Sequence, residues 1–143
     1  MNENILISAC LLGEPCRYDG RGKQNSRVVE LLKGKNLIPV CPEVEGGLGI
    51  PRPAAEIQGK EVRRENGEAV TEQFHVGASI CTKKALSAKV KEAVLKSRSP
   101  ACGCGHVYDG SFSGSLTRGD GIFTQHLKSV GIQCISDEDF LAK

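Results

Sequence analysis

The sequence predicts an α/β fold in which helices cover a mostly parallel sheet, within a single domain spanning residues 1–143. Short apolar runs rich in β-branched residues recur along the chain, and segments with helical periodicity separate most of them. This alternation of strands and helices is typical of a parallel sheet. The length of 143 residues suits one domain with a sizeable core.

The first half of the chain combines two strands, one helix and two long irregular stretches. In chain order we expect a strand at 5–9, a loop at 10–25, a helix from 26 to 33, a strand at 37–40, irregular structure within 42–58 and a β-hairpin at 60–71. Asn25 or Ser26 can cap the helix and Gly34 can end it. The hairpin prediction depends on Asn66-Gly67, a strong turn signal between two short runs, 61–64 and 68–71. We expect this hairpin to be a small insertion in the α/β fold.

The second half alternates helices and strands more regularly. We expect a helix at 74–92, a strand at 93–96, a glycine-rich loop at 103–121, a helix at 122–130, a strand at 132–135 and a short terminal helix at 137–141. Phe74, Ala78, Cys81 and Ala85 share one face of the first of these helices, which predicts that this face is buried. Gly131 marks the end of the next helix.

The overall composition excludes several classes of protein. The net charge of +2 is too small to indicate nucleic-acid binding, and no Trp, two Tyr and four Phe leave few platforms for stacking bases of a long strand. No run approaches the length of a membrane span, and the N-terminus lacks the features of a signal peptide. We therefore expect a cytoplasmic protein with no membrane partner, in which the seven cysteines are thiols or ligands rather than disulfides.

Three cysteines are the most informative feature of the chain. Cys10, Cys41 and Cys102 each follow an apolar run and lie beside turn-forming residues. Strand ends that converge at one edge of an open α/β sheet form ligand sites. Three thiols meeting there would suit a soft metal centre with one open position. The alternative is that the cysteines are small buried hydrophobes, because no Cys-x-x-Cys spacing supports a common metal motif.

The other four cysteines have different expected places. Cys81 lies on an apolar helix face and Cys134 alternates with apolar residues in a strand, so both are expected in the core. Cys16, in a loop, is a candidate ligand, a redox partner or only a loop residue. Cys104 is a candidate to replace or support Cys102.

Polar side chains near these cysteines are candidates for catalysis and binding. Glu43 and Glu45 follow Cys41, and a carboxylate beside a metal site can move a proton to or from bound water. Both could instead be solvated loop residues. Ser99 precedes Cys102 by three positions, so its hydroxyl could reach a substrate or only bond the backbone of a turn.

Basic residues of the loops could bind a polar or anionic ligand. They are Arg17, Arg21, Lys23 and Arg52. The segment around Arg21 and Lys23 lacks the spacing of a phosphate-binding loop. Glu56 could pair with Arg17 or Arg52 to hold the loops together. We assign Arg17, Arg52 and Glu45 to substrate binding.

Three long motifs resemble those of one family across essentially the whole chain. The sequence resembles the DUF523 family, whose characterised members are thiouracil desulfurases, in Ser8-Ala9-Cys10-Leu11-Leu12-Gly13 with Cys16-Arg17-Tyr18-Asp19-Gly20, in Cys41-Pro42-Glu43 through Pro51-Arg52-Pro53-Ala54-Ala55-Glu56-Ile57, and in Ser97-Arg98-Ser99-Pro100-Ala101-Cys102-Gly103 with Tyr108-Asp109-Gly110.

The resemblance implies a Rossmann-like, three-layer domain that binds a [4Fe-4S] cluster. It implies that Cys10, Cys41 and Cys102 are the metal ligands, that Glu43 is the catalytic acid or base, and that Ser99 assists in the pocket. It also implies an enzyme that removes sulfur from thiolated pyrimidine bases such as 2-thiouracil, without net electron transfer. One departure is Ala101, where family members commonly have Ser, and Cys104 lies nearby.

Two other classes of function stay open at this point. One is a non-catalytic, Rossmann-like module that binds a nucleotide or a structural metal. The other is a thiol redox protein that uses Cys16 or Cys104, which the absence of Cys-x-x-Cys disfavours. We expect a small thiolated base as the partner, no long nucleic acid, and a monomer or homodimer.

Overall fold

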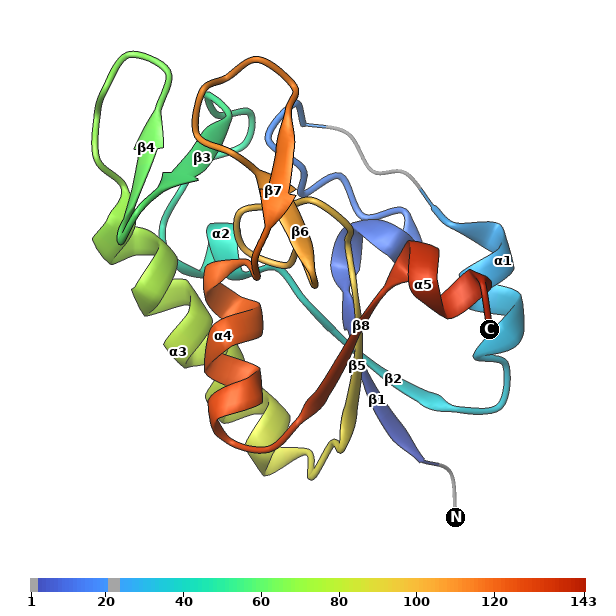
Figure 1. Ribbon diagram of the computed structural model, residues 1–143. Helices are drawn as coiled ribbons and strands as arrows, with labels where there is room; N and C mark the ends of the chain where they lie inside the picture. Colours follow the sequence, from blue (N-terminus) through green and yellow to red (C-terminus); the bar gives the residue numbers. More distant parts are fainter. Residues whose placement is uncertain (1–2, 21–23) are drawn as a thin grey trace.

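The centre of the molecule is a four-stranded parallel sheet with the order β2-β1-β5-β8. The computed structural model describes residues 3–20 and 24–143, and Figure 1 shows their arrangement. The strands are β1 (Asn4–Ser8), β2 (Asn36–Val40), β5 (Glu92–Leu95) and β8 (Gln133–Ser136). Each lies within one residue of a predicted apolar run, so the predicted parallel α/β fold is confirmed.

Helices cover both faces of this sheet, which gives three layers (Figure 1). One side carries η1 (Ala9–Leu12), α1 (Ser26–Leu31) and α5 (Asp137–Leu141), and the other carries α2 (Pro42–Glu45), α3 (Thr71–Ser87) and α4 (Ile122–Ser129). Successive residues of a strand face opposite sides of the sheet. Leu6 packs with Phe74 and Phe123 on one side, whereas Ile7 packs with Val28 on the other. This division follows from the two-residue period of a strand.

The hairpin insertion exists, but one predicted arm is wrong. β3 (Ala55–Gln58) pairs antiparallel with β4 (Glu61–Arg64), where we expected the second arm at 68–71. The Asn66-Gly67 turn does form, and Gly67 has a φ of +89°. Its far arm makes only one isolated bridge, between Arg63 and Ala69, because the chain enters α3 at Thr71.

A second hairpin lies within the region predicted to be a glycine-rich loop. β6 (His106–Tyr108) pairs antiparallel with β7 (Leu116–Arg118). Each of these strands has three residues, too short to give a periodic signal among glycines.

The helix predicted at 74–92 is shifted toward the N-terminus. It ends at Ser87, because Lys89 adopts a left-handed conformation with a φ of +55° and the Val90 N–H bonds back to the Ala85 carbonyl. The predicted cap of α1 is confirmed, since the Asn25 side chain accepts from the Val28 N–H at 3.2 Å. In the part of the chain that the structure describes, no helix is long and apolar enough to cross a membrane.

Candidate metal centre and active site

Three thiols gather where neighbouring strands of the sheet end. Cys10 lies in η1 just after β1, Cys41 caps α2 directly after β2, and Cys102 lies in the turn that follows β5. Because β2, β1 and β5 are adjacent and parallel, their carboxyl ends bring these thiols to one edge. The thiol of Cys102 interacts electrostatically with the thiols of both Cys10 and Cys41, and the thiol of Cys10 interacts in the same way with that of Cys41. The structure thus assembles the set that the sequence singled out.

Burial opposes ionisation of two of the three thiols. It raises the pKa of Cys10 to about 11, although the Lys96 cation partly offsets the effect. It also raises the pKa of Cys102, although a hydrogen bond with the Ser8 hydroxyl favours the thiolate. At Cys41 a hydrogen bond with Cys16 outweighs burial and lowers the pKa to about 7. Cys41 is therefore the first to ionise, and a metal cation must drive the others to lose their protons.

Three thiols form a donor set with the chemistry of an iron–sulfur site. Within residues 3–20 and 24–143, no three His, Cys, Asp or Glu side chains lie close enough to share one metal ion. The thiols nevertheless interact electrostatically across the site. An iron–sulfur cluster presents separate iron atoms to separate thiolates, so its ligands stand farther apart than those of zinc. Three sulfur ligands are a soft donor set suited to such a cluster and leave one iron without a protein ligand.

A buried arginine lies beside the carboxylate of Glu43, whose charge acts on two of the thiols. The Nε atom of Arg52 lies 3.5 Å from Oε1 of Glu43. Burial raises the pKa of Glu43, and the Arg52 guanidinium partly offsets this rise. The charge of Glu43 acts on both Cys41 and Cys102. Glu43 is therefore within electrostatic reach of two proposed ligands, with a cation that favours its ionised form.

The guanidinium of Arg52 is directed into the protein. Its side chain is 3% exposed, and Nη1 and Nη2 donate to the carbonyls of Gly49 (3.1 Å) and Cys16 (3.0 Å). These contacts tie the loop of Cys16 to the segment that follows α2. These contacts position the loop, and the contact of Arg52 with substrate that the sequence suggested stays a prediction.

The other two residues assigned to substrate binding lie in different surroundings. Arg17 is near the thiols, since its charge acts on Cys10, and it lies 3.8 Å from Asp19. Glu45 is turned to α3, where it accepts from Nζ of Lys84 at 2.8 Å. The structure thus brings Arg17 to the site and directs Glu45 away from it. Arg21 and Lys23 lie outside the described residues.

The Ser99 hydroxyl bonds to the turn that carries Cys102. Its Oγ accepts from the backbone N–H groups of Ala101 (3.1 Å) and Cys102 (3.0 Å). This is the local bonding expected of serine in a turn. The arrangement fixes the backbone beside the thiol. This role is structural, and a contact between Ser99 and a substrate would be additional to it.

Three polar residues that the sequence analysis did not single out also shape the site. Ser8 Oγ accepts from the Lys96 N–H at 2.9 Å and bonds the Cys102 thiol. The buried Asp137 carboxylate accepts from the Ser97 N–H at 2.8 Å, and the charges of Lys96 and Asp137 both act on Cys10. They come from the ends of three adjacent strands. The sequence signal that could have identified these residues is that each is a polar residue at the end of an apolar strand.

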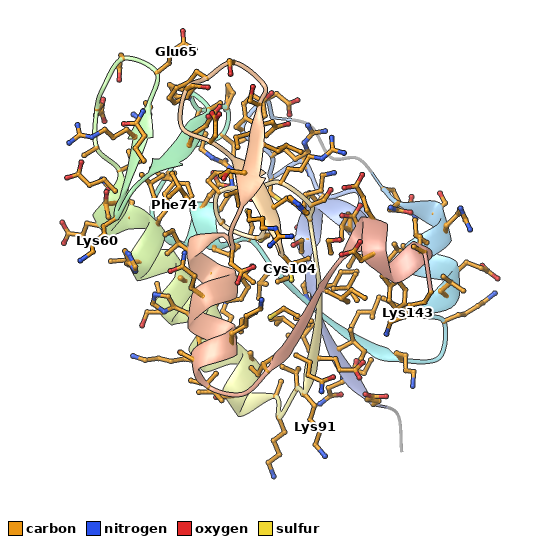
Figure 2. The ribbon with its side chains drawn as sticks, viewed as in Figure 1. Lys60, Glu65, Phe74, Lys91, Cys104 and Lys143 are labelled. Atoms are coloured by element: carbon orange, nitrogen blue, oxygen red, sulfur yellow. The ribbon has the colours of Figure 1, made fainter. Side chains whose placement is uncertain are left out.

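The remaining candidate thiol beside Cys102 points elsewhere. Cys104, which is labelled in Figure 2, donates to the carbonyl of Cys134 on β8 at 3.4 Å. The charges of Lys128, Asp120 and Asp139 act on the thiol of Cys104. This places Cys104 with Cys134, whereas Cys102 belongs with the other two strand-end thiols.

Close backbone contacts hold the segments that carry the ligands. A Cβ atom on Gly77 of α3 would overlap the carbonyl oxygen of Pro42, the residue after Cys41. A Cβ on Gly121, at the start of α4, would overlap the carbonyl of Ala101, the residue before Cys102. Glycine is required at both places because the backbones approach more closely than a side chain permits. The two helices on this face thereby set the positions of two thiols.

Comparison with known proteins gives the family of this chain. A sequence profile of the 2-thiouracil desulfurase family matches residues 5–139. The chain belongs to the 2-thiouracil desulfurase family. It is 34% identical over 145 residues to the uncharacterized protein YbbK of Bacillus subtilis (strain 168), which covers 94% of this chain and 96% of the relative.

A solved structure of similar fold has a named activity. It is the [4Fe-4S]-dependent thiouracil desulfidase TudS, also designated DUF523Vcz, with 41% sequence identity and a TM-score of 0.89. The match covers 99% of this chain and 95% of that one. The resemblance to DUF523 and the three-layer α/β fold expected from it are both confirmed.

Proposed function

We propose that this protein is a [4Fe-4S]-dependent desulfurase that converts a thiolated pyrimidine base such as 2-thiouracil to uracil and hydrogen sulfide. The observation that carries the proposal is the meeting of three thiols from adjacent strand ends beside the Glu43 carboxylate. Membership of the desulfurase family and the fold shared with TudS support it.

We assign Cys10, Cys41 and Cys102 as the residues that would hold the cluster. When bound, the cluster supplies one iron without a protein ligand, a Lewis acid suited to the soft sulfur of a C=S group. The net reaction is hydrolytic: water gives its oxygen to the thiocarbonyl carbon, and its two protons leave with the sulfur. The base and the protein therefore exchange no electrons.

Glu43 is the residue that we assign to proton transfer. Its ionised carboxylate can accept a proton from water, and its protonated form can return that proton to the departing sulfur. Because Arg52 engages Oε1, we assign the transferred proton to Oε2. Burial raises the pKa of Glu43, which brings the group closer to the pH at which both protonation states are available. The Arg52 guanidinium limits the rise.

Metal analysis and turnover together test the function. The protein is reconstituted without oxygen, and we expect about four iron and four labile sulfide per chain, as in a cubane cluster. Absorbance of 2-thiouracil then reports its conversion. Cys10→Ala, Cys41→Ala and Cys102→Ala should each lose the cluster, while Cys134→Ser, which changes a half-buried thiol outside the site, should keep it.

Variants at the carboxylate separate binding from chemistry. Glu43→Gln should retain iron and sulfide but lose turnover, because it cannot transfer a proton. Stoichiometric zinc without labile sulfide would contradict the desulfurase and favour a structural metal. Retention of a full cluster by all three alanine variants would refute the ligand assignment.

Two further properties are inferred from the arrangement of the chain. We infer that residues 1–143 act as one domain, because strands between Asn4 and Ser136 share one sheet. We also propose a small thiolated base, not a long nucleic acid, as substrate, which agrees with the small net charge and the few aromatic residues.

A further inference from the structure

Cys16 is a nucleophilic side chain at the site that the proposed mechanism does not use. It lies in the loop between η1 and α1 and is 8% exposed. It begins the motif Cys16-Arg17-Tyr18-Asp19-Gly20. A buried thiol in such a place is either a packing residue or a reaction partner for a neighbour.

The backbone of Cys16 is fixed against Cys41. Its carbonyl accepts from Nη2 of Arg52 at 3.0 Å and from the thiol of Cys41 at 3.6 Å. Its N–H donates to the carbonyl of Glu14 at 2.8 Å. Two contacts from outside the loop thus hold its backbone in place, and one of them is made by Cys41 itself.

The two side chains also interact. The thiol of Cys41 donates to the carbonyl of Cys16, and the two thiols shift each other's pKa, whereas Cys10 interacts with each of them only through its charge. A thiol that lies against the backbone of a second cysteine can reach the short sulfur–sulfur bond of a disulfide through side-chain rotation. Among the thiols of the site, Cys16 and Cys41 are therefore the pair placed to join.

The two thiols differ in their access to solvent. Cys41 is half-buried and Cys16 is buried. A small oxidant from solvent therefore meets Cys41 first, with Cys16 behind it. A half-exposed thiol poised beside a second, resolving thiol is the arrangement found in reversible redox sites.

We propose that Cys16 is the resolving partner of Cys41, and that a peroxide joins the two as a disulfide in the protein that lacks its cluster. The sulfur of Cys41 attacks hydrogen peroxide, which gives a sulfenic acid and one water. The sulfur of Cys16 then attacks that of Cys41, and a second water leaves as the disulfide forms. A dithiol reductant restores both thiols and is itself oxidised.

The consequence rests on the proposed role of Cys41 as a cluster ligand. While the disulfide persists, Cys41 cannot bind iron, so cluster assembly stops. The disulfide also protects Cys41 from irreversible oxidation to the sulfinic acid. A chain that loses its cluster in an oxidising environment would thus keep its ligand in a recoverable form.

Disulfide mapping of the cluster-free chain tests the proposal without any measurement of activity. Reduced protein is treated with one equivalent of hydrogen peroxide and its free thiols are alkylated, and we expect two of the seven thiols to be protected. Chymotrypsin can cut after Leu11 and Leu12, which separates Cys10 from Cys16. The digest should contain a peptide pair joined through Cys16 and Cys41.

A matched pair of variants provides the control. Cys16→Ser should not form this link. After excess peroxide and then dithiothreitol it should recover less iron binding than the wild type treated in the same way, because a second equivalent of peroxide converts its unprotected Cys41 to the sulfinic acid. Cys134→Ser changes a half-buried thiol of the Cys104–Cys134 pair and should form the link as the wild type does. Oxidised wild type should take up iron only after dithiothreitol.

Several results would overturn the proposal. A link between Cys10 and Cys41, a link between Cys104 and Cys134 alone, or unpaired sulfenic acid at Cys41 would each do so. Equal recovery of iron binding by Cys16→Ser and the wild type would also contradict it. Failure of the reduced chain to bind any iron would instead refute the proposed function, because the mapping requires no cluster.

Discussion

Replacement of Gly77 by alanine should destabilise the protein and displace a proposed ligand. Glycine inside a helix normally costs about 1 kcal/mol relative to alanine, so Gly77→Ala would stabilise an unconstrained α3. Here the new Cβ would overlap the Pro42 carbonyl oxygen and lie 2.9 Å from the Gly46 nitrogen. Both neighbours are backbone atoms, one in α2 and one in its C-cap residue, which no change of rotamer can move aside.

The two effects oppose each other, and the steric effect is larger. Overpacking of a tightly packed contact costs about 1–3 kcal/mol, and overlap with backbone belongs at the upper end of that range. After the gain in helix propensity is subtracted, we expect a net loss of about 2 kcal/mol. Because Pro42 follows Cys41 directly, movement of α2 also shifts the thiol, and iron retention should fall.

Urea unfolding of the cluster-free protein, followed by circular dichroism, measures the stability. Lys83→Ala, on an exposed part of α3, is the control for the effect of alanine on the helix. Iron per chain after reconstitution is the second measurement. An increase in the free energy of unfolding of about 1 kcal/mol, the propensity effect alone, would refute the close contact between α2 and α3.

Three further predictions concern the site and the surface. Arg52→Gln removes the cation that lowers the pKa of Glu43, so the acidic limb of kcat/KM should move to higher pH; an unmoved limb would mean that Glu43 does not control it. Ser99→Ala deletes two hydrogen bonds to the backbone and should cost about 1 kcal/mol of stability in urea, whereas Ser99→Thr, which keeps the hydroxyl, should cost less. Burial and the neighbouring His75 lower the pKa of His126, so the native state resists protonation and stability should fall as the pH drops below about 6.5. His126→Gln should flatten that dependence in urea titrations, and an unchanged slope would exclude the histidine pair as its source.

The two central strands of the sheet could be predicted because they are buried. Residues 5–7 and 93–95 are continuous apolar runs, and such runs give a strong signal without any knowledge of tertiary structure. The hairpins gave a weaker signal because none of their strands contains three consecutive aliphatic residues. The Asn66-Gly67 turn was identified correctly, but whether its far arm becomes a strand or a helix depends on packing against the rest of the fold.

The thiols of the site could be predicted, but their surroundings could not. Each proposed ligand follows a strand, so topology alone brings the three together. The contact between Cys16 and Cys41 joins two loops, and the pairing of Arg52 with Glu43 and the Cys16 carbonyl depends on the path of the chain between them. Local sequence holds no information on such contacts, so the pairing of Arg52 with these groups was not predicted.

The spacing of the three proposed ligands along the chain has a consequence for the life of the protein. A group bound by Cys10, Cys41 and Cys102 would link the chain across two long intervals, as cross-links do. The chain-entropy treatment of cross-links gives about 4 kcal/mol for closing each interval in the unfolded chain. Binding that occurs only in the folded state adds to its stability. An oxidant that destroys the cluster would then remove the catalytic group and both cross-links at once. The cluster-free chain would be less stable and therefore easier for proteases to degrade.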